Sequence, residues 1–320
     1  MITPAFARHE TFHPRIGWLS KAVQAVERDP TVFADKNATV RLGVGKNMVH
    51  AMRYWGTATK VVADSRVRGE MRVTPLGMYL LADSGVDQYA EDPTTLWLLH
   101  WSLLAEPVTA PTWWWAFNDL DLVDFGHEDM LRAERDWIAT FEWAKVAADT
   151  SLQKDLDCLI RMYTRRVLSA DIVDSQFASL GLMEAVPGAS KRWHFIGGPK
   201  ESLDPRLVLM TSLLSMMAWT PGDQTISVAR LNGQQGGPGR SFRLTEASIA
   251  NSLRAAAEGM PAVEVISAVG LPQLIVRAEK RTLVAQLLED LYDRRPDEDV
   301  VDQLVGGEPI MTTENAAVAP

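Results

Sequence analysis

The first residues that could carry out chemistry are His9, Glu10 and His13, which fit the H-E-x-x-H pattern of zinc hydrolases. On a helix this spacing places both imidazoles on one face, where they bind zinc while the glutamate activates water. Pro14 follows His13 and disfavours helical geometry there, and no third ligand is evident in the sequence. A zinc hydrolase acting through residues 9–13 is therefore a remote alternative.

Arg8, His9 and Glu10 are also candidates for a different reaction, the cleavage of a phosphodiester. That reaction needs an activated water or another nucleophile, and usually a cation that stabilises the developing charge. In such a site Arg8 would steady a phosphate, and Glu10 would bind a metal ion or orient water.

A richer group of carboxylates lies at 118–129, and its candidates for catalysis are Asp119 and Asp121. Carboxylate oxygens are preferred ligands of Mg²⁺ and Mn²⁺, so a divalent metal is the expected cofactor. The alternative for this stretch is a solvated loop that caps a helix expected at 128–146. The glycine-rich stretches of the chain lack the full phosphate-loop pattern, so we expect no nucleotide and no flavin.

Basic and amide side chains gather near the start of the chain. Residues 1–80 hold 12 Lys and Arg against 6 Asp and Glu, whereas the rest holds 20 basic and 35 acidic residues. A local positive block on an acidic protein suits a docking face for a phosphate polymer, and the alternative is a solvated surface. The candidates for DNA contact are Lys36, Arg41, Lys46, Asn47, His50, Arg53, Lys60, Arg66, Arg68 and Arg72.

Apolar spacing and turn residues predict the elements that position these side chains. In order they are three helices, a hairpin and a fourth helix, at 13–28, 36–42, 46–59, 60–73 and from 75 onward. This order describes a winged helix-turn-helix domain over 1–85, whose third helix would enter the major groove while the hairpin contacts the DNA backbone. The alternative is a winged helix that makes protein contacts alone.

The rest of the chain is predicted to be mainly α with small β-hairpins, so the fold class is α+β. Its parts are a Trp-rich helical middle domain with a hairpin near 182–198, a winged-helix-like α/β unit with a following helix, and a flexible acidic tail. These parts are expected at 86–222, 223–295 and 296–320. The tryptophans have core-like spacing, which favours packing over base stacking.

The composition, 47% hydrophobic and 23% charged residues, is that of an ordinary globular protein. The longest nearly apolar run, 207–219, is shorter than the roughly 20 residues that a membrane-spanning helix needs, so we expect no membrane contact. The single cysteine, Cys158, excludes an internal disulfide, and no secretory signal is evident, so a cytoplasmic protein is expected.

Three segments resemble a known bacterial family: FARHETFHPRIGWLSKAV at 6–23, FADKNATVRLGVGKNMVHAMRYWGTAT at 33–59 and PGRSFRLTEASI at 238–249. They are similar to the SspB-like family, domain of unknown function 4007, whose members form the B component of Ssp-type DNA phosphorothioation systems. The similarity spans most of 6–280. The family-like positions are Arg8 to Phe12, Arg15, Trp18, Lys21 and the block from Gly43 to Arg53, and His13 lies outside them.

The resemblance implies a DNA-binding protein that nicks one strand of duplex DNA, in support of sulfur modification of the backbone in antiphage defence. It also implies three protein partners: a cysteine desulfurase, an ATPase and an ATP-pyrophosphatase-type sulfurtransferase. A homodimer is left open. The resemblance identifies no catalytic residue. The alternative function is a non-catalytic winged-helix DNA-binding recruiter or transcriptional regulator.

Overall fold

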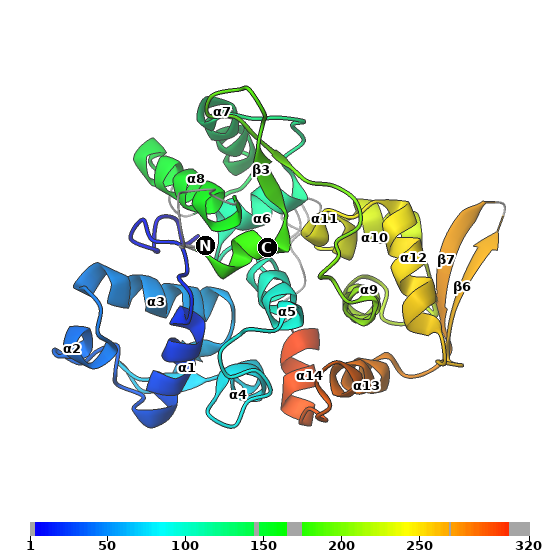
Figure 1. Cartoon of the computed structure of the whole chain (residues 1–320), viewed down its shortest axis with the longest axis horizontal. Coiled ribbons are helices and arrows are strands. Elements are labelled where there is room, and N and C mark those ends of the chain that lie inside the picture. Colours follow the sequence, from blue (N-terminus) through cyan, green and yellow to red (C-terminus); the bar gives the residue numbers. More distant parts are fainter. Residues whose placement is uncertain (1–3, 144–146, 165–174, 269, 307–320) are drawn as a thin grey trace. The chain divides into compact units, whose positions relative to one another are not determined.

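The computed structural model describes residues 4–143, 147–164, 175–268 and 270–306 (Figure 1). Contacts divide the chain into two compact units. Unit 1 comprises Met1–Ala116 and Leu120–Ile196, and unit 2 comprises Phe117–Asp119 and Gly197–Pro320. The described residues form mainly helices with small antiparallel sheets, which confirms the α+β class. The expected parts 1–85 and 86–196 fall in one unit by their contacts, and the expected domain boundaries stay predictions.

The first part of unit 1 contains the elements predicted for it, in the predicted order. They are α1 (Trp18–Arg28), α2 (Ala38–Leu42), α3 (Lys46–Ala58), β1 (Val62–Asp64), β2 (Met71–Val73) and α4 (Pro75–Leu81). Gly43 ends α2 in the left-handed conformation, with φ of 63°, and the Thr74 hydroxyl caps α4 by accepting the Gly77 N–H. The β1–β2 hairpin is antiparallel and pairs Val62 with Val73.

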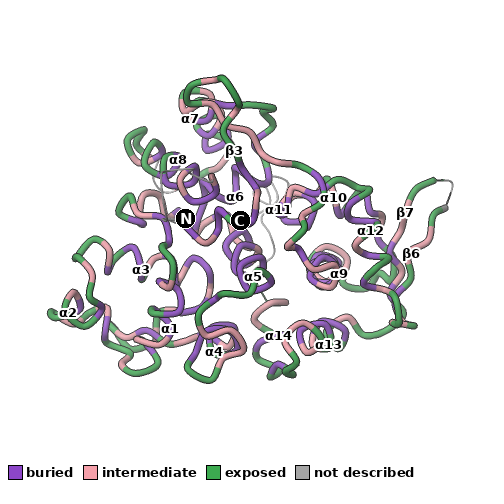
Figure 2. Tube along the Cα trace, viewed as in Figure 1, coloured by how far each residue is buried: buried purple, intermediate pink, exposed green. Residues whose placement is uncertain are grey.

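The second part of unit 1 packs its tryptophans inside. Its elements are α5 (Pro93–Leu103), the start of α6 (Pro111–Asn118), α7 (His127–Ile138), α8 (Asp149–Tyr163), the 3₁₀ helix η1 (Gln176–Leu180), β3 (Met183–Ala185) and β4 (Trp193–Phe195). Trp97, Trp113, Trp114 and Trp115 are almost fully buried, which confirms that they form the core (Figure 2). The helix expected at 128–146 is shorter than predicted, because α7 ends at Ile138.

Unit 2 combines helices with a three-stranded antiparallel sheet of order β5-β7-β6. Its elements are α9 (Pro205–Trp219), β5 (Thr225–Ser227), α10 (Val228–Gly233), α11 (Pro238–Phe242), α12 (Glu246–Ala257), β6 (Val263–Ala268), β7 (Leu271–Val276), α13 (Lys280–Tyr292) and α14 (Glu298–Val305). Among the described helices, none has both the length and the apolar character needed to cross a membrane.

The prediction of a flexible tail from residue 296 is wrong for its first part. Residues 298–305 form α14, whose Val300 and Val301 side chains are buried against the rest of unit 2. A short amphipathic stripe inside an acidic segment was enough to fold this helix. The remainder of the expected tail, 307–320, lies outside the described residues.

A buried acid in the core of unit 1 makes the stability of the protein depend on pH. The Thr112 hydroxyl donates to Glu134 Oε1 over 2.5 Å, and both residues are fully buried. Burial raises the pKa of Glu134 well above its ordinary value of 4.5. The folded state therefore keeps a proton on Glu134 at pH values where the unfolded chain has lost it.

We predict that Glu134→Gln reduces the loss of stability with rising pH. A carboxyl whose pKa is raised on folding makes the free energy of unfolding fall as pH rises above about 4.5, and glutamine does not titrate. Urea unfolding at about pH 5 and pH 8, followed by circular dichroism, measures this slope. Glu91→Gln, at an exposed site, should keep the wild-type slope. Equal slopes in wild type and Glu134→Gln would contradict the prediction.

Candidate nucleic-acid interface

The segment around the H-E-x-x-H pattern forms a strained loop and no helix. We call residues 7–12 the HETF loop. Ala7, Glu10 and Thr11 have positive φ angles of 54°, 50° and 67°, which residues with a side chain seldom adopt. Such strain persists only where surrounding contacts fix it, and it is concentrated at functional sites. The observed strain therefore marks this loop as a candidate site.

Contacts from three directions hold the HETF loop in place. The Ala7 N–H donates to the Asp155 carboxylate of α8 over 3.0 Å, and Arg161, also on α8, donates to the Thr11 carbonyl over 2.8 Å. From α3, Trp55 Nε1 donates to the Phe12 carbonyl over 2.8 Å. The loop accordingly lies against both α3 and α8 (Figure 1).

His9 is the anchor of this loop and does not face solvent. Its imidazole is fully buried, with Nε2 2.5 Å from Asp155 Oδ1 and the ring stacked on Trp55 at 5.9 Å between centroids. Burial raises the pKa of Asp155, and the hydrogen bond from His9 opposes that rise. This burial is inconsistent with the expected contact between His9 and a substrate.

The geometry required of a zinc hydrolase is also absent from residues 9–13. The segment is not helical, His9 is engaged by Asp155, and His13 is buried. The sequence pattern arose without the helix that gives it meaning, so the zinc alternative is wrong in its geometry.

Glu10 and His50 form an exposed pair where the HETF loop meets α3. Glu10 Oε1 lies 3.8 Å from His50 Nδ1, and the two side chains are 42% and 50% exposed. Lys46 and Asn47, one turn earlier on α3, are exposed as well, and so is Arg53, one turn later. The family-like loop and the expected DNA-contacting helix therefore meet at one surface.

The other basic candidates differ in how much of their charge is already paired. Arg53 pairs with Asp64 over 2.7 Å, Lys60 pairs with Glu106, and Arg41 pairs with both Asp29 and Asp35. Hydrogen bonds from Thr31 and then from Arg41 lower the pKa of Asp29 to about 2, so the Arg41 pair persists at any ordinary pH. These three cations must exchange a carboxylate for a phosphate in order to bind DNA.

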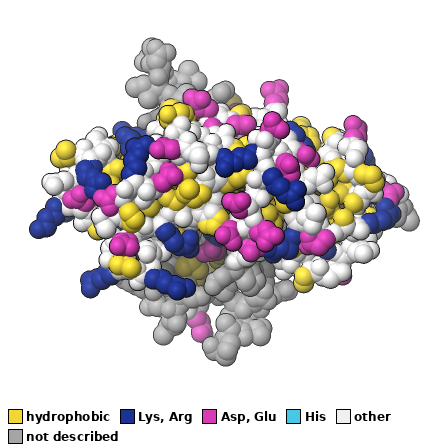
Figure 3. Space-filling view, turned by 90° about the horizontal axis from the view of Figure 1, so that it is seen from below, with side chains coloured by type: hydrophobic (Ala, Val, Ile, Leu, Met, Phe, Trp, Pro, Cys, Tyr) yellow, Lys and Arg dark blue, Asp and Glu magenta, His cyan; other side chains and the backbone are white. Residues whose placement is uncertain are grey.

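The remaining cations of this region are available for such contacts. They are exposed, and no ion pair to another described residue involves them: Arg8, Lys36, Lys46, Arg66, Arg68 and Arg72. Elsewhere basic and acidic side chains are mixed, as the face shown in Figure 3 illustrates. Three of the unpaired cations, Arg66, Arg68 and Arg72, lie on or beside the β1–β2 hairpin.

The expected pair Asp119 and Asp121 is divided between the two compact units. Within unit 2, Gln235 Nε2 donates to Asp119 Oδ1 over 2.9 Å, and the Gly236 N–H donates to the neighbouring Asn118 over 2.6 Å. Asp121 belongs to unit 1 and is exposed. Across the described part of the chain, no group of three His, Cys, Asp or Glu side chains could hold a metal ion. The residues present therefore do not fit a metal held by protein ligands alone.

Sequence reasoning missed a groove in unit 1 that lies between α7, α8 and the loop before β4. The groove has a volume of about 860 Å³, and its lining includes His127, Glu128, Asp157, Lys191 and Trp193. His127 Nε2 lies 2.6 Å from Asp157 Oδ1. The signal in the sequence was weak, because the residues that complete the groove are 30 to 66 positions away from His127.

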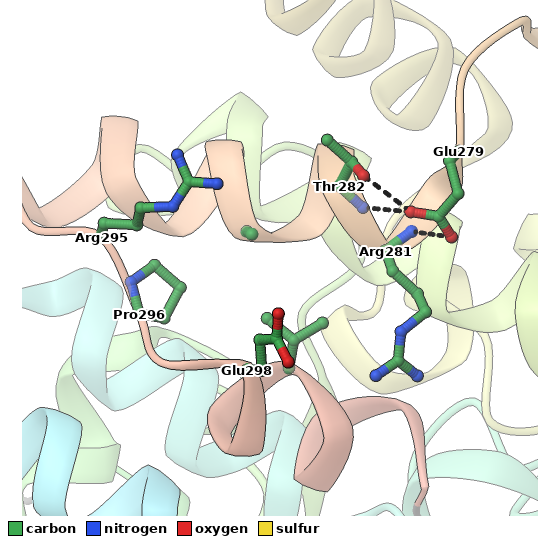
Figure 4. A pocket seen from close by; sticks show the side chains of 8 residues that line it. Glu279, Arg281, Thr282, Arg295, Pro296 and Glu298 are labelled. Atoms are coloured by element: carbon green, nitrogen blue, oxygen red, sulfur yellow. Dashed lines mark hydrogen bonds between the residues drawn. The ribbon is translucent and has the colours of Figure 1, made fainter.

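A smaller hollow of about 350 Å³ lies in unit 2 between α13 and α14 (Figure 4). Its charged residues serve the fold. The Glu279 carboxylate caps α13 by accepting the Arg281 and Thr282 N–H groups over 2.9 and 2.6 Å. The Arg281 side chain pairs with Asp302 of α14. Because these charges are satisfied within unit 2, the hollow is not a strong candidate for function.

Comparison with known proteins places the chain in a family. Residues 6–292 match the family described as Protein of unknown function (DUF4007), and the chain belongs to it. Two solved structures are similar: a magnesium ion-bound SspB crystal structure, 34% identical, and an SspB crystal structure, 35% identical. Both have a TM-score of 0.81, and each alignment covers 98% of this chain and 92% of the other. No curated protein matches the sequence.

We predict that Asp155→Ala lowers the free energy of unfolding by about 3–5 kcal/mol, because it leaves His9 buried without its partner. It should also speed amide hydrogen exchange across residues 7–12, which lose their anchor. Asp149→Ala is the matched control, because Asp149 lies on the same helix in an exposed pair with Arg135 and should cost less than about 1 kcal/mol. Equal effects of the two substitutions would contradict the anchoring role of Asp155.

Proposed function

We propose that this protein binds duplex DNA and nicks one strand, in support of phosphorothioate modification of the DNA backbone in antiphage defence. The membership of the family and the likeness to SspB over 98% of the chain support a place in an Ssp-type system. The observation that carries the proposal is the meeting of the strained HETF loop with the exposed basic face of α3, at the Glu10–His50 pair.

In this proposal α3 is the recognition helix of a winged helix-turn-helix, and the β1–β2 hairpin is its wing. Lys46, His50 and Arg53 are spaced by four and three residues, so they lie on one face of α3, with Asn47 beside them. A recognition helix reads base edges in the major groove with its N-terminal residues, and amide and guanidinium groups suit that task. Arg66, Arg68 and Arg72 supply cations for the phosphates beside the groove.

A divalent cation, Mg²⁺ or Mn²⁺, is part of the proposal as a cofactor that enters with the DNA. Mg²⁺ commonly keeps several waters and binds through substrate phosphates, and it would neutralise charge that develops on the phosphate during cleavage. We assign no residue of this chain as its ligand, because the described residues form no cluster that could hold it.

The protein partners proposed for this role are a cysteine desulfurase, an ATPase and an ATP-pyrophosphatase-type sulfurtransferase. In this scheme, the nick made by the present chain gives the sulfur-inserting enzymes access to the backbone.

A second candidate function is a DNA-binding recruiter or transcriptional regulator without catalysis. It is favoured by one specific observation, which is that the described residues bring no set of metal ligands together. Both candidates require the same DNA-binding face, and they differ in whether the strand is cut.

We predict that Arg66→Glu/Arg68→Glu weakens duplex binding at least tenfold and lowers its salt dependence. Each phosphate contact that is lost should reduce the log–log slope of affinity against salt by about 0.9. Fluorescence anisotropy with a labelled duplex at several salt concentrations measures both effects.

The matched control is Arg254→Glu/Arg277→Glu, which makes the same charge change at exposed residues of unit 2. Unequal affinities of the two variants at equal helicity support the assigned face. If the control weakens binding as much as the hairpin variant, net charge alone explains the affinity and the assigned face is wrong.

We predict that the purified wild type converts supercoiled plasmid to the open circular form with Mg²⁺ or Mn²⁺, and not with EDTA. An agarose gel distinguishes a single nick from linear DNA. Because the recruiter binds DNA without cutting it, duplex binding with no open circular product under any of these conditions would favour the recruiter over the nickase.

A further inference from the structure

Unit 1 presents three exposed histidines that each face a carboxylate. They are His50 with Glu10 at 3.8 Å, His127 with Asp157 at 2.6 Å, and His194 with Glu184 at 3.0 Å. A histidine oriented by a carboxylate is the usual arrangement of a general base, because the carboxylate holds the ring and stabilises its protonated form. The three pairs differ in what surrounds them, and that difference separates them as candidates.

Charge distinguishes the His50 pair from the His127 pair. The groove beside His127 is also lined by Glu128 and Asp129, and its Arg192 is already held by Asp124 and Asp129. A phosphodiester that entered this groove would meet three carboxylates, counting Asp157.

His50 instead lies on the outer face of α3 among groups that attract phosphate. Lys46 and Arg53 are its neighbours one turn away in each direction, and Asn47 is exposed beside it. Arg161 of α8 reaches the HETF loop at the Thr11 carbonyl. The charged groups around His50 are therefore one carboxylate and several cations, which suits the charge that develops on a phosphate during cleavage.

Geometry also favours the His50 pair. Glu10 approaches Nδ1 of the imidazole, which leaves Nε2 for a substrate or a water. Glu10 is itself presented by a loop in a strained conformation, which Asp155, Arg161 and Trp55 hold. The separation of 3.8 Å is longer than a hydrogen bond, and such contacts often tighten when substrate binds.

We propose that His50 is the general base of the strand cleavage and that Glu10 is the residue that orients it. The inference rests on the proposed nicking activity. His50 Nε2 accepts a proton from water, and the water oxygen forms a bond to phosphorus. The bond from phosphorus to one sugar oxygen breaks, and that oxygen takes a proton from solvent. The imidazolium beside Glu10 returns its proton to water, so protons balance over the cycle.

The test compares His50→Ala, His127→Ala and His194→Ala with wild type in plasmid nicking, with duplex affinity and helicity measured for each. General-base catalysis contributes roughly 10²–10⁴-fold. We expect His50→Ala to lose at least 100-fold in nicking rate while duplex affinity changes less than threefold. His194→Ala is the matched control, because it removes an exposed histidine with a carboxylate partner from the β3–β4 hairpin of the same unit.

Two further readouts separate catalysis from structure. The wild-type nicking rate should rise with pH over the range in which imidazoles titrate, about pH 5 to 8, and this rise should be absent in the residual activity of His50→Ala. Glu10→Gln should lower the nicking rate about tenfold or more at unchanged duplex affinity, because its amide cannot stabilise the imidazolium.

Each outcome decides a different claim. If wild type nicks and His50→Ala nicks at the same rate, this inference is wrong and the proposed function stands. If nicking is lost in His127→Ala and kept in His50→Ala, the chemistry belongs to the α7 groove, which also overturns the inference. If wild type binds duplex and never nicks, the proposed function fails, and the assignment of a general base fails with it.

Discussion

The buried contact between His9 and Asp155 is the constraint on which the candidate site depends. It joins a segment near the start of the chain to α8, 146 positions later, in a core where neither group reaches water. Breaking a buried pair of this kind leaves an uncompensated polar group, which is strongly destabilising. The contact therefore fixes the HETF loop firmly enough to keep Ala7, Glu10 and Thr11 at positive φ. With the loop fixed in this way, Glu10 faces α3.

Electrostatics then separates the two exposed histidine–carboxylate pairs that could act on DNA. The protein is acidic as a whole, with a formal net charge of −9, yet its first 80 residues carry a surplus of cations. Several of those cations, including Arg41, Arg53 and Lys60, are engaged by carboxylates, so the positive charge on the surface is less than the sequence suggests. The cations without such partners lie on α3 and around the β1–β2 hairpin, which narrows the interface to those elements.

The sequence predicted the local elements well and the long-range contacts poorly. The order from α1 to α4 followed from apolar spacing, from Gly43 and from Thr74, because each of these signals acts within a few residues. The buried position of the tryptophans was also predictable from their spacing. In contrast, the tail prediction failed at α14, where two buried valines outweigh the acidic composition.

The candidate site was predictable only in part. The loop and α3 were both identified, but His9 was assigned to catalysis because nothing in residues 8–12 reveals that Asp155 buries it. The partners of His9, Asp119 and His127 all lie more than 25 positions away, and such contacts are formed by the packed core. The expected pairing of Asp119 with Asp121 failed for the same reason, since neighbours in sequence joined different compact units.

Site-specific crosslinking to DNA tests the central claim most directly. A photoreactive phenylalanine analogue would replace Asn47 on α3 or, as the matched control, Asn251 on α12, and each protein would be irradiated with a labelled duplex. The account predicts a covalent protein–DNA product from position 47 and little or none from position 251. A product from position 251 alone, with binding intact in both proteins, would contradict the assignment of α3 as the DNA-contacting helix.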